Sequence, residues 1–155
     1  MGEEHIGTFM TAIGMVSIVT DGNTVRAVYL PSQNLPAMEE GTDPVMEQAV
    51  REIDEYLAGR RKVFDVPISI DGSDFAVDVL VSMSEIPYGE TVTYSQLAEK
   101  SGHPGAARAV GTVCANNVLP ILIPCHRVLA STGIGQYSGG VALKQRLLNI
   151  EKEYR

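Results

Sequence analysis

Two helix-forming segments, separated by a glycine-rich break, constrain the fold of this chain more than any other feature. Thr93 and Gln96 have the spacing of a capping box, which predicts that the first helix begins there. Residues 102–105 break the chain, and a second helix is predicted over residues 106–116. Helix, glycine-containing turn and helix is the pattern of a helix-turn-helix. An ordinary helical hairpin packed in a core has the same pattern, and the local sequence alone favours the hairpin.

The second predicted helix consists largely of small residues. Alanine and glycine recur along it, at Ala106, Ala107, Ala109, Gly111 and Ala115. Small side chains allow a helix backbone to come close to another surface. Cys114, also in this helix, is interpreted as a structural cysteine because unpaired cysteines are commonly buried.

The first part of the chain predicts a small α/β unit. Residues 15–19 and 25–30 are rich in Val and Ile, and the Asp-Gly-Asn sequence between them predicts a β-hairpin. A helix is predicted over residues 44–58, capped by Asp43. Residues 63–70 alternate like a strand or an extended linker.

Asp71-Gly72-Ser73 interrupts the pattern, so we expect two domains, 1–72 and 73–155. In the second domain a helix is predicted over residues 73–84. The aliphatic run 121–123 predicts a short buried strand, and residues 131–140 form a glycine-rich loop.

The last predicted helix covers residues 141–154. Its apolar stripe consists of Leu143, Leu147, Ile150 and Tyr154. Glu151 flanks this stripe, so its carboxylate is expected to face inward.

Charge is distributed unevenly along the chain. Residues 1–85 carry five basic and fifteen acidic groups, whereas residues 86–155 carry seven basic and four acidic groups. The asymmetry is typical of a chain whose C-terminal half meets an anionic partner. An acidic half that only aids solubility fits the same numbers equally well.

Cys125 and His126 follow the aliphatic run directly, after Pro124. A thiol must become a thiolate before it can attack a carbon atom, and an imidazole can take its proton directly or through a water. A carboxylate such as Glu151 would orient the imidazole and stabilise its cation. A Cys-His pair by itself fits a buried structural cysteine better than a catalytic one.

Four motifs in this order resemble the O6-alkylguanine-DNA alkyltransferase family, also called methylated-DNA–protein-cysteine methyltransferases. They are IPYGETVTYSQLA, AARAVG, ILIPCHRV and YSGG, and the similarity extends over about residues 75–151. The resemblance implies a ribonuclease-H-like α/β N-terminal domain. It also implies a mostly α C-terminal, winged-helix-like domain that contains the helix-turn-helix. The implied activity is removal of an alkyl group from guanine O6 in double-stranded DNA, transferred irreversibly to a cysteine in a single turnover.

The resemblance also assigns roles to individual residues. Cys125 would be the nucleophile and His126 its base, acting through a water and held by Glu151. Asn117 would brace the site, and Tyr94 would donate a proton or a hydrogen bond to N3 of the flipped guanine. Further residues would bind the base, namely Val128, Tyr137, Ser138 and Gly139. Others would contact DNA in the minor groove, namely Arg108, Ala107, Gly111, Thr93 and Ser95, with Arg108 filling the space of the flipped nucleotide.

Two rival functions use the same residues. A non-catalytic lesion binder of the alkyltransferase-like kind would lack the reactive cysteine, and Cys125 argues against it. A cysteine hydrolase with Cys125, His126 and Glu151 would turn over repeatedly and ignore DNA.

No cofactor is expected. No metal site is expected either, because the two cysteines and three histidines lack the usual ligand spacing. No membrane segment is expected, and Arg127 is assigned to a structural ion pair. We expect a monomer in the cytoplasm, or in the nucleus of a eukaryote.

Overall fold

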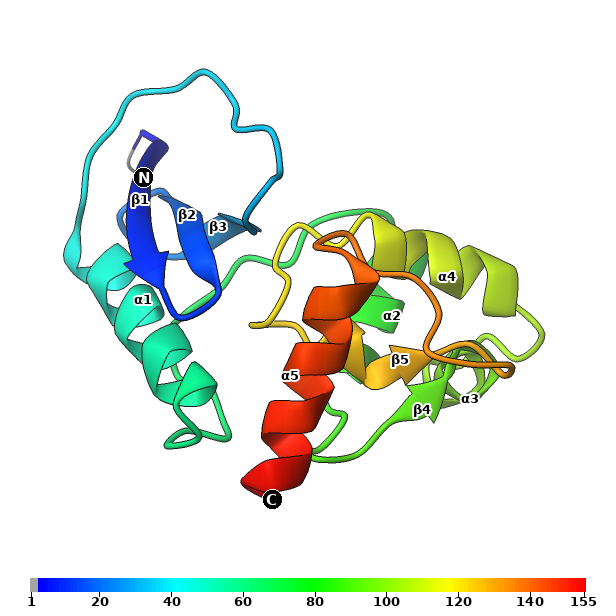
Figure 1. Cartoon of the computed structure of the whole chain (residues 1–155). Coiled ribbons are helices and arrows are strands. Elements are labelled where there is room, and N and C mark those ends of the chain that lie inside the picture. The colour runs from blue at the N-terminus through cyan, green and yellow to red at the C-terminus, as the bar shows by residue number, and fades with distance from the viewer. Residues whose placement is uncertain (1–2) are drawn as a thin grey trace. The chain divides into compact units, whose positions relative to one another are not determined.

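The computed structural model describes residues 3–155, which form two compact units (Figure 1). Unit 1 extends to Ser69 and unit 2 begins at Ile70, slightly before the break at residues 71–73. The described residues form five α-helices and two small sheets, so the fold is mixed α/β. None of the described helices is long and apolar enough to cross a membrane.

Unit 1 contains a three-stranded antiparallel sheet. Its strands β1 (His5–Thr11), β2 (Gly14–Thr20) and β3 (Val25–Tyr29) lie in chain order, which confirms the predicted hairpin between the second and third strands. The first strand, whose sequence is HIGTFMT, was not predicted.

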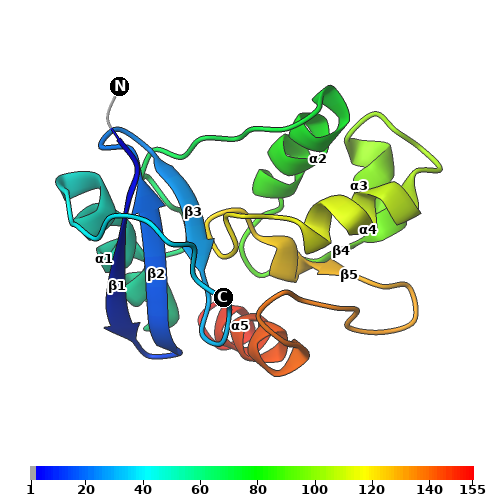
Figure 2. The same ribbon diagram turned by 90° about the horizontal axis from the view of Figure 1, so that it is seen from above.

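Helix α1 (Pro44–Leu57) lies against one face of this sheet (Figures 1 and 2). The side chain of Asp43 accepts a hydrogen bond from the Met46 backbone N–H, so the predicted cap is confirmed. On its buried side the helix also carries Glu52, whose Oε1 accepts from the backbone N–H of Asp65 and Val66. These bonds hold the segment after α1 as an extended linker, and only Ile68 within it forms a β-bridge, to Val25.

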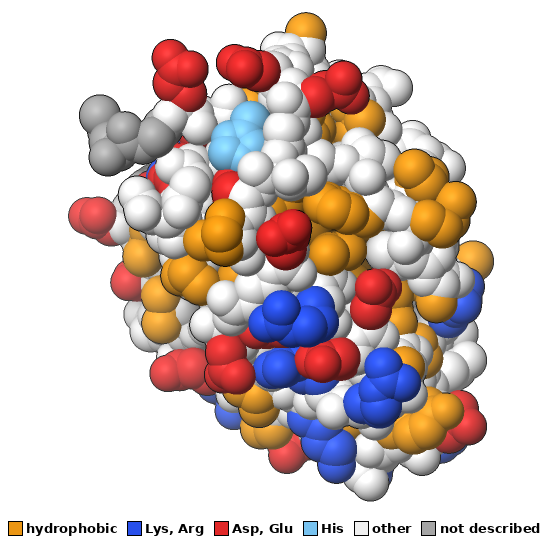
Figure 3. Space-filling model, turned by 90° about the vertical axis from the view of Figure 1, so that its left-hand side faces the viewer, with side chains coloured by type: hydrophobic (Ala, Val, Ile, Leu, Met, Phe, Trp, Pro, Cys, Tyr) orange, Lys and Arg blue, Asp and Glu red, His pale blue; other side chains and the backbone are white. Residues whose placement is uncertain are grey.

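Acidic side chains are spread over the face of the molecule shown in Figure 3, and a smaller group of basic side chains lies among them. This face contains much of unit 1, the part of the chain with the excess of Asp and Glu. On this face acidic and basic side chains are therefore mixed.

Unit 2 contains a cluster of three helices, α2 (Asp74–Ser84), α3 (Tyr94–Lys100) and α4 (Ala107–Ala115), which pack on one another. The predicted capping box is present: Thr93 Oγ1 accepts from the Gln96 N–H, and Gln96 Oε1 accepts from the Thr93 N–H. Glycines with positive φ in the turn between α3 and α4, at Gly102 and Gly105, end one helix before the next begins.

The remainder of unit 2 brings the chain after Cys125 beside the start of α3. Strand β4 (Val92–Thr93) pairs in parallel with β5 (Val128–Leu129), a pairing that was not predicted. A single 3₁₀ turn, η1 (Cys125–Arg127), precedes β5, and α5 (Val141–Glu153) packs against it (Figures 1 and 2).

The prediction of a strand at residues 121–123 is wrong. This buried aliphatic segment is a tight turn, in which the Ile123 N–H donates to Leu119 O and Pro120 forms only an isolated bridge to Ile123. Ile121 adopts a φ of 73°, a left-handed conformation that is unfavourable for a β-branched residue. The side chain of Asn117 holds this turn in place, and its hydrogen bonds are not visible in the apolar pattern.

Candidate functional site

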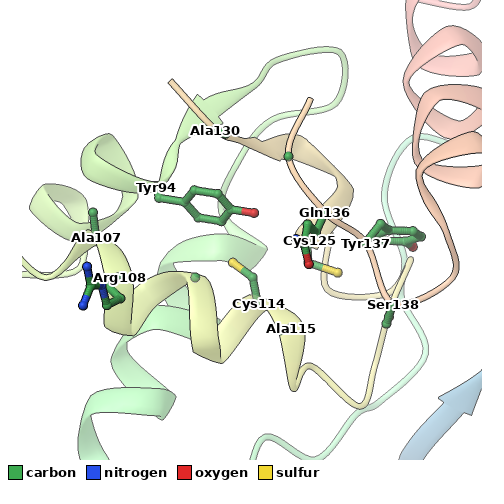
Figure 4. Close-up of a pocket in the computed structure, with 12 residues that line it drawn as sticks. Tyr94, Ala107, Arg108, Cys114, Ala115, Cys125, Ala130, Gln136, Tyr137 and Ser138 are labelled. Atoms are coloured by element: carbon green, nitrogen blue, oxygen red, sulfur yellow. The ribbon is translucent and has the colours of Figure 1, made fainter. Parts of the chain in front are cut away.

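A cavity of about 530 Å³ in unit 2 is bordered by four segments that are distant in the sequence. They are Tyr94 at the start of α3, one face of α4, Cys125, and the loop from Ala130 to Ser138. Figure 4 shows the Tyr94 hydroxyl pointing toward the end of the cavity with Cys125 and Gln136, and Arg108 at the opposite end. A thiol, a phenol and an exposed guanidinium therefore line the same cavity.

Cys125 reaches this cavity although it is 4% exposed. Burial raises the pKa of its thiol to about 11, and the Asn117 side chain and the charge of Lys144 oppose this rise without overcoming it. With such a pKa only about one thiol in ten thousand is ionised at pH 7. The cysteine is thus a protonated thiol at rest and needs a base to become a nucleophile.

His126 lies next to Cys125 in the 3₁₀ turn and is completely buried. Its Nε2 lies 2.6 Å from Glu151 Oε2. Burial lowers the pKa of the imidazole, and the hydrogen bond and negative charge of Glu151 partly oppose this. A neutral imidazole whose Nε2–H donates to Glu151 carries its acceptor lone pair on Nδ1. His126 is therefore suited to accept a proton.

Glu151 is the centre of a buried hydrogen-bond network. Arg127 donates to it from Nε at 2.9 Å and from Nη2 at 3.0 Å, and the Gly89 N–H donates at 2.9 Å. Arg127 Nη1 also donates to Ile86 O, so the ion pair anchors the turn before β4. The inward position of Glu151 and the structural ion pair of Arg127, both predicted from sequence, are present.

Asn117 supports the segment that leads into Cys125. Its Nδ2 donates to Ile123 O at 3.1 Å and its Oδ1 accepts from the Leu119 N–H at 3.0 Å. A single buried side chain therefore closes the turn that contains the strained Ile121. This position fits the bracing role expected for Asn117.

The structure brings most of the predicted site residues together. Tyr94, Ala107, Arg108, Gly111, Cys125, Tyr137 and Ser138 line the cavity. Thr93 and Ser95 line an adjoining shallow pocket with Arg108, and His126, Glu151 and Asn117 are buried. Val128 and Gly139 are not among the residues that line the cavity; Val128 is fully buried and its carbonyl accepts from Lys144.

A second thiol lines the same cavity. Cys114 is 8% exposed, and burial raises the pKa of its thiol to about 12. A thiol with this pKa is unreactive at neutral pH, which agrees with the structural assignment made from the sequence. Among residues 3–155 no group of three or more His, Cys, Asp or Glu side chains could hold a metal ion.

Residues 74–153 match the family model described as 6-O-methylguanine DNA methyltransferase, DNA binding domain. The methylated-DNA–protein-cysteine methyltransferase of Mycobacterium tuberculosis is 37% identical over 144 residues, 92% of this chain and 86% of that protein. The protein of the same name from Mycolicibacterium paratuberculosis is 42% identical over 94% of this chain and 87% of its own length. The chain belongs to the methylated-DNA–protein-cysteine methyltransferase family.

A solved structure agrees with this assignment to the methyltransferase family. The crystal structure of Mycobacterium tuberculosis OGT in complex with DNA superimposes with a TM-score of 0.90 at 34% identity, covering 97% of this chain and 94% of that one. All residues predicted for the site lie within the segment that matches the family's DNA-binding domain.

One residue that the site uses was missed in the sequence. Lys144 is fully buried beside the cavity loop, where the apolar pattern had placed Leu143. Lys144, Leu147 and Glu151 follow the i, i+3, i+7 spacing of one helix face, and all three are buried. Glu151 was already expected to face inward, and Lys144 lies seven residues before it on the same helix face. This spacing could have predicted that Lys144 is buried in this methyltransferase-family chain.

Proposed function

We propose that this protein repairs DNA by transferring the alkyl group of O6-alkylguanine to Cys125, once per molecule. The observation that carries the proposal is Cys125 on the wall of a cavity formed by α3, α4 and the loop 130–138, with His126 and Glu151 behind it. Relatives that cover most of this chain are named methylated-DNA–protein-cysteine methyltransferases, and the Mycobacterium tuberculosis OGT was crystallised with DNA.

The chemistry requires an anionic sulfur and a leaving group that can accept electrons. The Cys125 thiol proton passes through a water to His126, whose imidazolium Glu151 then stabilises. The sulfur attacks the alkyl carbon and forms a C–S bond with it. The bond between the alkyl carbon and O6 breaks, and its electron pair moves into the guanine ring. A proton from Tyr94 at N3 neutralises the departing guanine. The thioether that remains is stable, so the reaction stops after one turnover.

The alkylated base must leave the helical stack before Cys125 can reach it. Helices α3 and α4 would act as the helix-turn-helix, with α4 in the minor groove because Ala107 and Gly111 allow close approach. Arg108 is exposed at the end of the cavity away from Cys125, a position that suits insertion into the gap left by the flipped nucleotide. Thr93 and Ser95, beside Arg108, would contact the backbone.

The flipped guanine would be held by the cavity walls. The carbonyls of Cys125 and Val128 would accept from its amino group, since a carbonyl has two lone pairs and that of Val128 uses one for Lys144. Tyr137, Ser138 and Gly139 would close the loop over it, with the Ser138 N–H directed to O6. Unit 1 would have the ribonuclease-H-like fold, and the protein would act as a cytoplasmic monomer.

Intact-mass spectrometry after incubation with a methylated duplex tests the proposal. We expect one added methyl group per molecule, located on Cys125 by peptide mapping, and no further change with excess substrate. An unmethylated duplex of the same sequence is the control. Retained DNA binding without any adduct would instead support a lesion binder, and repeated turnover of a small ester would support a hydrolase.

A further inference from the structure

Lys144, in the first part of α5, is a lysine with no exposed surface at all. A buried ammonium group is very unfavourable unless its donors are satisfied. Here all three protons have acceptors: Nζ donates to Val128 O at 2.7 Å, to Ile134 O at 2.6 Å and to Gln136 O at 3.0 Å. The group is therefore fully engaged by backbone carbonyls.

The three carbonyls come from two segments that border Cys125. Val128 follows the 3₁₀ turn that contains Cys125, whereas Ile134 and Gln136 flank Gly135 in the loop that walls the cavity. A φ of 77° at Gly135 allows the two neighbouring carbonyls to converge on one ammonium group. Lys144 thus joins the loop to the reactive segment.

Little room remains around Gly135. A Cβ atom placed there would lie 3.2 Å from Ala130 N, 3.2 Å from Tyr94 Oη and 3.5 Å from Lys144 Nζ. The Gln136 backbone lowers the pKa of Tyr94, against the larger effect of burial, which raises it. Residues 135 and 136 therefore lie between Lys144 and the tyrosine that projects into the cavity.

Helix α5 holds the segment 125–128 at two points. Glu151 binds His126 and Arg127, and Lys144, two turns earlier on the same buried face, binds Val128. Leu147 lies between them and is also fully buried. The helix can therefore set the position of the cavity loop relative to the cysteine.

We propose that Lys144 is a positioning residue for alkyl transfer, which holds residues 134–136 against Val128 and thereby fixes the Tyr94 hydroxyl over the base-binding cavity. This inference rests on the proposed function, since it needs a base in the cavity for Tyr94 to contact. The positive charge of Lys144 adds a second effect in the same direction, because it lowers the pKa of Cys125 against the dominant effect of burial.

The test compares Lys144→Met with Lys152→Met, an exposed lysine on the same helix. The rate constant for single-turnover transfer is measured with saturating methylated duplex, and DNA affinity is measured separately in a Cys125→Ala background. We expect Lys144→Met to lower the rate constant by about 100-fold, the effect of misplacing a reacting group by about 1 Å. The DNA affinity of Lys144→Met should stay within about twofold of the wild-type value. For Lys152→Met, both the rate constant and the DNA affinity should stay within about twofold of wild type.

A double mutant separates positioning from general loss of structure. If Lys144 acts through Tyr94, Lys144→Met combined with Tyr94→Phe should be no slower than the slower single variant. Effects that multiply would overturn the inference, as would a Lys144→Met rate equal to that of Lys152→Met.

Gly135→Ala disturbs the same loop but leaves the buried charge of Lys144 in place. It therefore tests the inference even if Lys144→Met does not fold. It should slow transfer on the order of tenfold by moving the loop away from Tyr94, and a wild-type rate would contradict the inference. Absence of transfer by the wild-type protein would refute the proposed function itself, a result distinct from all of these.

Discussion

His126 and Glu151 are joined by a hydrogen bond of 2.6 Å between Nε2 and Oε2, in a region where both side chains are withdrawn from water. The same carboxylate binds the Arg127 guanidinium. One negative charge therefore orients the proposed base and neutralises a buried cation. Its removal should affect stability and reactivity together.

Glu151→Gln tests this double role. The substitution keeps the shape of the side chain but leaves Arg127 as an uncompensated buried charge, so we expect a loss of about 3–5 kcal/mol in the free energy of unfolding. Chemical denaturation measures this loss. Glu153→Gln, on the exposed side of the same helix, is the control and should change stability by less than about 0.5 kcal/mol. Equal losses of unfolding free energy in Glu151→Gln and Glu153→Gln would show that the buried network does not stabilise the fold.

The reactivity of Cys125 toward a small electrophile should depend steeply on pH. Because burial raises the pKa of this thiol to about 11, its thiolate fraction increases about tenfold for each pH unit between 7 and 10. We expect the rate of carboxamidomethylation of Cys125 by iodoacetamide to follow this slope, measured by peptide mass spectrometry. A rate that is already constant at pH 7 would mean that the thiol is ionised at rest.

The same pKa predicts a stability change at alkaline pH. The thiol has an ordinary pKa of 9.0 when unfolded and about 11 when folded, so the unfolded state loses its proton first as pH rises. Stability should consequently fall between about pH 9 and pH 11. Cys125→Ser lacks this titration, and its unfolding free energy should decline less over the same range. Parallel curves for the two proteins would contradict the raised pKa.

Asn117→Ala should destabilise the turn before the cysteine. It removes the acceptor of the Leu119 N–H and the donor to Ile123 O, both buried, and each unsatisfied group costs about 1–3 kcal/mol. We expect a loss of about 2–4 kcal/mol by thermal or chemical unfolding. Asn116→Ala, the same change at an exposed neighbour, is the control and should have an effect below about 0.5 kcal/mol.

Arg108→Ala should separate base flipping from chemistry. We expect transfer from a methylated duplex to slow by at least about tenfold, since keeping a base unstacked is worth a few kcal/mol. Reaction with the free base O6-methylguanine should change much less, because no flipping is needed. Arg146→Ala removes the same charge from α5 and serves as the control. Equal slowing with duplex and free base would argue against a wedge role for Arg108.

Cys125→Ala should abolish transfer and leave DNA affinity within about twofold, because binding is assigned to α3 and α4. Fluorescence anisotropy with a labelled methylated duplex measures the affinity, and intact mass measures the transfer. Loss of both properties would mean that the cysteine and the binding surface are not separable.

Local sequence was sufficient for the elements that depend on local chemistry. Asp43 and Thr93 begin helices because their side chains satisfy backbone N–H groups within the next turn. Capping of this kind requires no distant partner, so the helix starts at residues 44 and 94 could be predicted. For Cys125 and His126 the pair alone favoured a structural cysteine, and the resemblance of the surrounding motif to a known family made them the candidate reactive pair.

Tertiary contacts decided the features that local patterns describe wrongly or not at all. Residues 121–123 have the composition of a buried strand, yet Asn117 and the surrounding core impose a turn with Ile121 in a left-handed conformation. Likewise Lys144 is a surface residue by composition, and only the convergence of the Val128, Ile134 and Gln136 carbonyls makes its burial favourable. The sequence by itself determined which side chains are capable of the chemistry. Packing decided which of them meet, because a buried polar group is stable only where distant segments supply its partners.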